Sequence, residues 1–217
     1  MIVIHFILHI NEYIASFIDS YGALTYLILF LVIFCETGLV FLPFLPGDSL
    51  IFAAATFSTA AYASTGHLNY WWLYGMFIVA AVVGDNVNYL IGRELGERIV
   101  KSQKIKFLNE KNLNKAYTFI EKHGSKAVFL ARFMPIIRTI VPFVIGAGEM
   151  NWKKFTVYNL VGGVVWVTLF INLGYFFGNM VGDHFSLVML GIIFLSLIPI
   201  VIEVIGNIVK KMRKVRG

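Results

Sequence analysis

The chain has 217 residues, of which 59% are hydrophobic and 14% are charged, and its formal net charge is +6. Apolar runs of about 20 residues are the mark of membrane spans, so this composition excludes an ordinary soluble domain. The single cysteine, Cys35, also excludes an internal disulfide and a multi-cysteine metal site. We expect one membrane domain over residues 1–217. The apolar runs, or parts of runs, are residues 22–35, 71–91, 155–178 and 185–206.

Positive charge is confined to the later part of the chain. Residues 1–92 contain no lysine or arginine, and all eighteen lie from Arg93 onward. Nine of them fall between Arg93 and Lys126, and five lie in the C-terminal tail KKMRKVRG. A basic chain can bind nucleic acid, but in a membrane protein such asymmetry indicates the cytoplasmic side. We expect no nucleic-acid partner, and we expect residues 93–126 and the C-terminus to be cytoplasmic.

Residues 1–20 are expected to form a helix that lies on the membrane surface. Their polar side chains follow spacings of three and four residues, which places them on one helix face. The first three would also suit a metal ion, but an interfacial polar face is the simpler interpretation, and we expect neither a metal nor a cofactor. The polar residues are His5, His9, Glu12, Ser16 and Asp19.

Residues 21–92 are expected to form a hairpin followed by one span. The segment FLPFLPGDSL, residues 41–50, interrupts an apolar stretch with two prolines, a glycine and an aspartate. A re-entrant hairpin and a pair of spans both return the chain to the side from which it came. A span from about Trp71 to Ile91 follows. The residues expected to break the first hairpin are Pro43, Pro46 and Gly47.

Residues 93–126 are expected to be a cytoplasmic segment that contains an amphipathic helix. Apolar residues fall at helical spacing opposite a lysine-rich face, which is typical of a helix on a membrane surface. Gly124 suits the C-terminal cap of that helix. The apolar positions are Leu113, Ala116, Tyr117 and Ile120.

Residues 127–180 repeat the pattern of a hairpin and a span. The apolar stretch 127–148 holds two arginines, each costing about 2.5–3.5 kcal/mol at the centre of a lipid-exposed helix. If residues 149–154 share the cytoplasmic side with 93–126, this stretch must enter and leave on one side. Irregular backbone is tolerated there only beside protein or water. The expected breaks are Pro135 and Pro142.

The predicted fold is therefore an all-α polytopic membrane protein built as an inverted repeat. Each repeat is a re-entrant helix hairpin plus a transmembrane helix, an arrangement that transporters use. An N-terminal interfacial helix precedes the repeats, and a last span with the basic tail occupies residues 181–217. Gly174, Gly178 and Gly182 form a small-residue pattern that suits internal helix packing better than a homodimer interface.

Four ionisable residues at membrane depth are the candidate substrate-binding set: Glu36, Asp48, Arg132 and Arg138. Intramembrane charges are functional by default, although they could also lock the two hairpins together. Arginine suits phosphate because its planar fork binds two oxygens. Glu36 and Asp48 are also the candidates for coupling transport to protons. Asp85 is either a helix-packing residue or a polar residue behind the site.

Three segments of the chain resemble the DedA family, also described as SNARE-associated or VTT-type membrane proteins. They are FCETGLVFLPFLPGDSL, GDNVNYLIGRELG and FLARFMPIIRTIVPFVIGAGEMNWKKF, and the third carries the R-F-x-P-x-x-R signature. The resemblance covers roughly residues 12–180. It implies two re-entrant hairpins that face each other, with Glu36, Asp48, Arg132 and Arg138 as the important charges. The family pattern commonly has Glu where this chain has Asp48.

The resemblance also implies a function and a location. Members of the family are similar to transporters that move undecaprenyl phosphate, or a phospholipid such as phosphatidylethanolamine, between leaflets of the bacterial inner membrane. We expect that undecaprenyl phosphate is the substrate, and a phospholipid such as phosphatidylethanolamine is the alternative. A membrane scaffold or an intramembrane lipid-phosphate enzyme are the other classes. We expect that the protein is not an enzyme, because the chain has neither an H-E-x-x-H zinc motif nor a G-x-S-x-G nucleophile motif.

Overall fold

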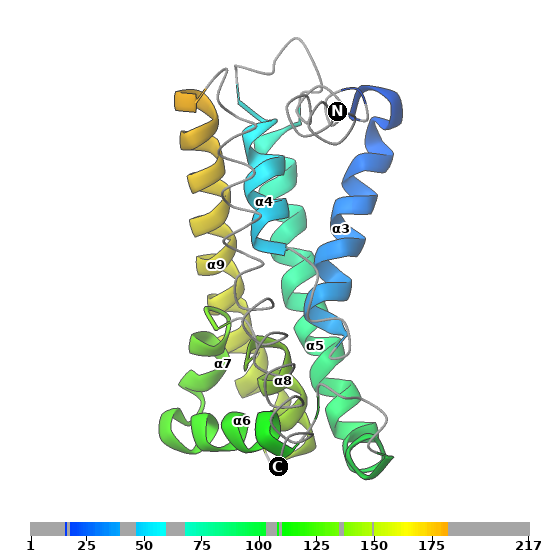
Figure 1. The fold of residues 1–217 in the computed structure, drawn as a ribbon, viewed down its shortest axis with the longest axis vertical. Coiled ribbons are helices and arrows are strands. Elements are labelled where there is room, and N and C mark those ends of the chain that lie inside the picture. Colours follow the sequence, from blue (N-terminus) through cyan, green and yellow to red (C-terminus); the bar gives the residue numbers. More distant parts are fainter. Residues whose placement is uncertain are drawn as a thin grey trace, which may run out of the picture.

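The computed structural model describes most of the chain between residues 16 and 181, and all of its regular structure there is helical (Figure 1). The expected interfacial helix, apart from a few residues at its end, and the last span lie outside the described residues. The described residues are 16, 18–39, 47–59, 68–102, 108, 110–134, 137–148 and 150–181. The helices are α3 (Ala23–Gly38), α4 (Gly47–Thr56), α5 (Tyr70–Ser102), α6 (Glu110–His123), α7 (Lys126–Ala131), α8 (Ile137–Ala147) and α9 (Trp152–Val181).

Two of these helices, α5 and α9, are long and apolar enough to cross a membrane. Their apolar stretches, Tyr70–Gly96 and Trp152–Gly178, each have 27 residues. At 1.5 Å per residue each extends about 40 Å, which exceeds the hydrocarbon thickness of a bilayer. Both correspond to expected spans. However, α5 continues to Ser102, past its expected end at about Ile91, because arginine, glutamate and lysine favour helix beyond the apolar part.

The four helices that come from the expected hairpins are all shorter than a span. The first pair, α3 and α4, has 16 and 10 residues, and the second pair, α7 and α8, has 6 and 11. In Figure 1, α3 starts and α4 ends at the upper end of the molecule, whereas α7 starts and α8 ends at the lower end. Each pair therefore returns to the end from which it started, and the two pairs start from opposite ends.

The structure tests only some of the residues that we expected to interrupt the two helix pairs. Pro43, Pro46 and Pro135 lie outside the described residues. Gly47 is the first residue of α4. The expectation for Pro142 is wrong, because this proline lies inside α8. A proline removes one helix hydrogen bond, but membrane helices tolerate this where neighbouring helices cover the backbone.

The two pairs pack in a crossed pattern against the long helices. The first helix of each pair packs on the long helix that follows it, α3 on α5 and α7 on α9. The second helix of each pair packs on the other long helix, α4 on α9 and α8 on α5. The elements thus occupy equivalent places in two halves that run in opposite directions, as an inverted repeat would require.

Glycines at equivalent places permit these close contacts. A Cβ at Gly92 of α5 would overlap the carbonyl group of Phe143 in α8. In the other half, a Cβ at Gly174 of α9 would overlap the carbonyl oxygen of Phe52 in α4. The residue one turn later in each long helix is again a glycine in close contact. These second contacts are Gly96 with Ala147 and Gly178 with Thr56.

The expectation that Gly174 and Gly178 serve internal packing is therefore confirmed. Both glycines face α4 of the same chain. Gly182 lies outside the described residues. A homodimer stays a prediction.

Apart from Arg132 and Arg138, the lysines and arginines that the structure describes lie at one end of the molecule. They belong to the end of α5, to α6, and to the starts of α7 and α9, all at the lower end in Figure 1. The segments 93–126 and 149–154, which we expect on one side of the membrane, share this end as far as they are described. α6 is the amphipathic helix expected there, and it buries Leu113 and Ala116.

The buried apolar residues form two clusters, one toward each end of the molecule. The upper cluster includes Ile33, Phe77 and Ile171, and the lower one includes Tyr89 and Phe143. Along α5 the two clusters are separated by Asp85, which is itself buried. The charged residues of the candidate site occupy this polar layer.

Candidate functional site

Arg138 joins the two helix pairs at the centre of the molecule. Its Nη2 lies 3.0 Å from Oε2 of Glu36, and its Nη1 lies 3.1 Å from Oδ1 of Asp48. The guanidinium therefore uses both arms of its fork, one for a carboxylate from α3 and one for a carboxylate from α4. Arg138 and Glu36 are both buried, whereas the side chain of Asp48 is 36% exposed. Three of the four expected residues thus meet directly.

The start of α4 places the Glu36 carboxylate. A backbone hydrogen bond joins Gly47 to this carboxylate, which lies at the end of α4 where backbone N–H groups lack helix partners. A Cβ on Gly47 would overlap the carboxylate oxygens. Gly47 therefore does more than interrupt a helix, since its missing side chain lets the acid approach both α4 and Arg138.

Arg132, the fourth expected residue, has a different acidic partner. Its Nη2 lies 2.5 Å from Oδ2 of Asp85, and the same nitrogen donates to Oδ1 of Asn159. Among the described residues, Glu36 and Asp48 pair with Arg138, and Arg132 pairs with Asp85. Asp85 is a direct partner of an arginine rather than a packing residue. The spacing in sequence could not show which acid each arginine faces.

Glycines of α9 make room for the Arg132 side chain. A Cβ at Gly162 would lie 3.0 Å from Cδ of Arg132, and one at Gly163 would lie 3.5 Å from Nη2. The Nε of Arg132 is buried and has no hydrogen-bond acceptor among the described residues. A buried donor of this kind is costly unless a partner binds it.

Trp166 of α9 links the two ion-paired groups, and the sequence analysis missed it. The side chain is fully buried, and its Nε1 donates to Oδ1 of Asp48 at 3.0 Å. Its ring centre lies 4.6 Å from the guanidinium carbon of Arg138 and 6.0 Å from that of Arg132. Both distances allow cation–π attraction. The available signal was its place in the middle of a span, far from the membrane interfaces where tryptophan gathers.

The charges of this site do not balance when all five groups are ionised. Glu36, Asp48 and Asp85 carry three negative charges, and Arg132 and Arg138 carry two positive ones. The sum is therefore one negative charge in a largely buried layer. Binding one proton would neutralise the set. A dianionic phosphate would first have to take an arginine from its carboxylates.

Polar side chains also line the contact between α5 and α9 on both sides of the site. Above it, two tyrosine hydroxyls of α5 bond polar side chains of α9, and below it an asparagine of α5 bonds a threonine. All six are half-buried. We call these residues the α5–α9 polar seam. The pairs are Tyr70 with Asn172 at 3.2 Å, Tyr74 with Thr168 at 3.0 Å and Asn86 with Thr156 at 2.8 Å.

Comparison with known proteins places the chain in a family. The VTT domain matches residues 45–176. Protein DedA of Escherichia coli K12 is 47% identical over 206 residues, covering 94% of this chain and 93% of the relative. An uncharacterized membrane protein of Mycobacterium leprae is 37% identical over 173 residues, covering 79% of this chain and 75% of the relative.

A third relative carries a location in its name. The inner membrane protein YqjA of Escherichia coli K12 is 31% identical over 154 residues, covering 71% of this chain and 68% of the relative. No solved structure matches the chain. The VTT domain match includes Asp48, Asp85, Arg132 and Arg138, and it begins after Glu36. The match to DedA covers nearly the whole chain. The chain is a membrane protein of the DedA family.

Proposed function

We propose that this protein moves an anionic lipid phosphate between membrane leaflets, with undecaprenyl phosphate as the first substrate. The observation that carries the proposal is the Arg138 guanidinium, held by Glu36 and Asp48 between two helix pairs that start from opposite ends of the molecule. A fixed structural lock would not need so many buried charges at the one layer where both pairs turn back.

The arrangement of the elements supports a re-entrant topology. The pairs α3–α4 and α7–α8 are too short to span, and each returns to its own end of the molecule. In the proposal both enter the bilayer and turn back near its midplane, as the broken helices of transporters do. The end that carries the basic residues faces the cytoplasm of a bacterial cell, because positive charge stays inside.

The mechanism that we propose is an exchange of partners at Arg138. A phosphate oxygen replaces a carboxylate on the guanidinium, and bidentate arginine–phosphate bonds are among the strongest hydrogen bonds in proteins. A proton on Glu36 or Asp48 would release one arm of the fork and remove the excess negative charge. The unsatisfied Nε of Arg132 supplies a further donor for the same anion. The lipid tails stay in the bilayer while the headgroup crosses.

A phospholipid such as phosphatidylethanolamine is the second candidate, and the exposure of Asp48 favours it. The Asp48 side chain is 36% exposed, against 6% for Glu36, so an amine of the headgroup could reach this carboxylate. A zwitterionic headgroup needs one partner of each sign, and Asp48 beside Arg138 offers both.

The experiment that separates the substrates and the protein classes uses vesicles that contain only this protein. Undecaprenyl phosphate, phosphatidylethanolamine and phosphatidylcholine are each followed from one leaflet to the other. The proposal expects fastest movement of undecaprenyl phosphate and little of phosphatidylcholine. Release of inorganic phosphate from the lipid would instead indicate an enzyme. No movement of any lipid would indicate a scaffold.

A further inference from the structure

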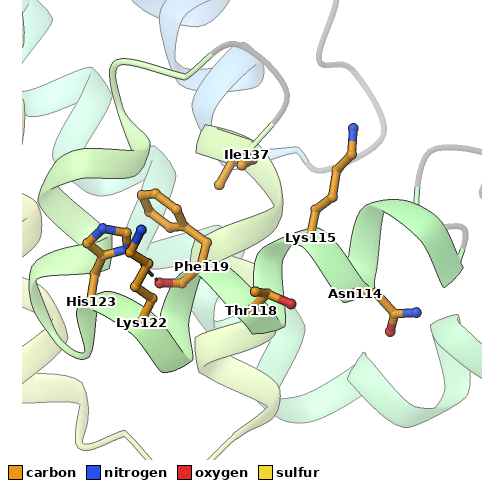
Figure 2. Close-up of a pocket in the computed structure, with 7 residues that line it drawn as sticks. All are labelled: Asn114, Lys115, Thr118, Phe119, Lys122, His123 and Ile137. Carbon is orange, nitrogen blue, oxygen red and sulfur yellow. Dashed lines mark hydrogen bonds between the residues drawn. The ribbon is translucent and has the colours of Figure 1, made fainter.

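The outer face of α6 carries a groove that the site described above does not include. α6 buries one face in the lower apolar cluster, and the groove, of about 640 Å³, runs along a different face of the helix (Figure 2). We call it the α6 groove. Its lining residues are Asn114, Lys115, Thr118, Phe119, Lys122, His123 and Ile137.

The α6 groove combines positive charge with an apolar floor. Lys115 and Lys122 are both exposed and lie two helical turns apart, with Phe119 between them. The His123 ring packs on Phe119 with ring centres 4.4 Å apart, and its Nδ1 donates to the Phe119 carbonyl oxygen at 2.9 Å. None of the lining residues is a carboxylate. An anionic headgroup with an apolar body fits such a surface better than a free inorganic ion does.

The position of the groove connects it to the central site. Ile137, the first residue of α8, lines the groove together with Phe119, and both are labelled in Figure 2. The next residue along the chain is Arg138, which holds Glu36 and Asp48. The groove therefore starts on the helix at the basic end of the molecule and reaches the start of the helix that carries the site arginine.

We propose that the α6 groove is a loading site for the phosphate headgroup of an anionic membrane lipid. Lys115 and Lys122 attract the phosphate, and Phe119 and Ile137 contact the first carbons of the lipid. In the proposal, the headgroup then moves past Ile137 toward Arg138. This inference rests on the proposed function and adds to it the place where the lipid is first bound.

The test uses nanodiscs of phosphatidylcholine that hold the full chain and a little phosphatidic acid with a photoactivatable group beside its phosphate. The lipid should label residues 114–123 and 137. Each lysine near the anionic headgroup contributes about fivefold in affinity, so Lys115→Gln with Lys122→Gln should weaken labelling about 25-fold. Lys153→Gln with Lys154→Gln is the matched control, because it removes two exposed charges at the same end but outside the groove.

A second pair of variants tests the groove itself at unchanged charge. Thr118→Trp fills the groove and should reduce labelling, whereas Tyr117→Trp, at an exposed residue outside the lining, should not. Equal losses in the two lysine pairs would overturn the proposal in favour of general surface attraction. If inorganic phosphate displaced the lipid when added at the same concentration as the lipid, the groove would be a site for free phosphate, and the proposal of a lipid site would be wrong.

Lipid transport measured in parallel keeps the two proposals apart. At limiting lipid, Lys115→Gln with Lys122→Gln should raise the lipid concentration that gives half the maximal rate, and the control pair should not. Groove labelling without transport by the wild-type protein would support the groove and overturn the proposed function. Transport without groove labelling would support the proposed function and overturn the groove.

Discussion

At the scale of single residues, the two arginines differ in how they are held. Arg138 uses both terminal nitrogens, one for each of two carboxylates. The polar contacts of Arg132 with other described residues run through Nη2, to Asp85, Asn159 and the Ala81 carbonyl oxygen. Lysine keeps the charge of arginine but loses the planar fork, so it should replace the two arginines unequally.

Arg138→Lys should therefore impair transport more than Arg132→Lys. A lysine at 138 cannot serve Glu36 and Asp48 from two nitrogens, and the lost charged hydrogen bond should lower the transport rate about tenfold or more. A lysine at 132 can place its three donors where Nη2 now lies, and we expect a smaller loss. The measurement is lipid movement in vesicles at matched protein insertion. Equal losses in the two variants would contradict this difference.

Glu36→Gln tests whether protonation belongs to the transport cycle. The groups that face Glu36 are Arg138, Asp48 and, more distantly, Asp85. The amide keeps the shape of the acid and removes its charge, so the dependence of transport on pH should flatten. Glu94→Gln, at an exposed position, is the control. A pH profile that is the same in Glu36→Gln and wild type would exclude Glu36 as the coupling residue.

At the scale of helices, the ends of the short elements and the glycines beside them build the site. Gly47 starts α4 and leaves space for the Glu36 carboxylate. Gly162 and Gly163 leave space for Arg132. The charges are thus placed by close backbone approach, which is why small residues are frequent in membrane helix contacts.

Gly47→Ala should separate this role from helix propensity. The added methyl group would displace the Glu36 carboxylate and weaken its bond to Arg138, so transport should fall about tenfold. Gly75→Ala is the matched control, since a Cβ there meets nothing within 4 Å. Alanine in a helix is up to about 1 kcal/mol more favourable than glycine, so the control should insert normally. A wild-type transport rate in Gly47→Ala would contradict this prediction, because it would show that the Glu36 carboxylate can still reach Arg138.

The charged residues of the site are easier to predict from the sequence than the contacts that they make. Glu36, Asp48 and Arg138 could be predicted because a charge in an apolar run is conspicuous. Their pairing could be expected, but the partner of Arg132 could not, since it depends on how α5 and α7 face each other. Trp166 was missed although a tryptophan in the middle of a span is unusual, because its partners Asp48 and Arg138 come from other helices and do not show in the sequence around it. Pro142 was misread as a break because its tolerance depends on neighbouring helices.

At the scale of the whole molecule, crossed packing ties the two halves together. Each long helix packs mainly on one short helix from its own half and one from the other. A movement of one helix pair must therefore disturb both long helices, along whose contact the α5–α9 polar seam lies.

The proposed membrane topology can be tested by labelling. In a Cys35→Ala background, single cysteines at Asn114 and Lys153 should react with a membrane-impermeant reagent only from the cytoplasmic side. A cysteine at Gly66 should react only from the outside. These expectations follow from the basic residues at the lower end of the molecule. Labelling of position 153 from outside would remove the second re-entrant pair from the proposal.

In the proposed function, the arginines of the buried layer carry a lipid phosphate across the membrane. The most direct test is the rate of undecaprenyl phosphate movement in vesicles that contain only this protein, as wild type or as the Arg132→Ala/Arg138→Ala double variant. Matched insertion of the two proteins is checked by protease accessibility. We expect rapid movement with the wild type and the rate of protein-free vesicles with the double variant. A wild-type rate in the double variant would contradict it.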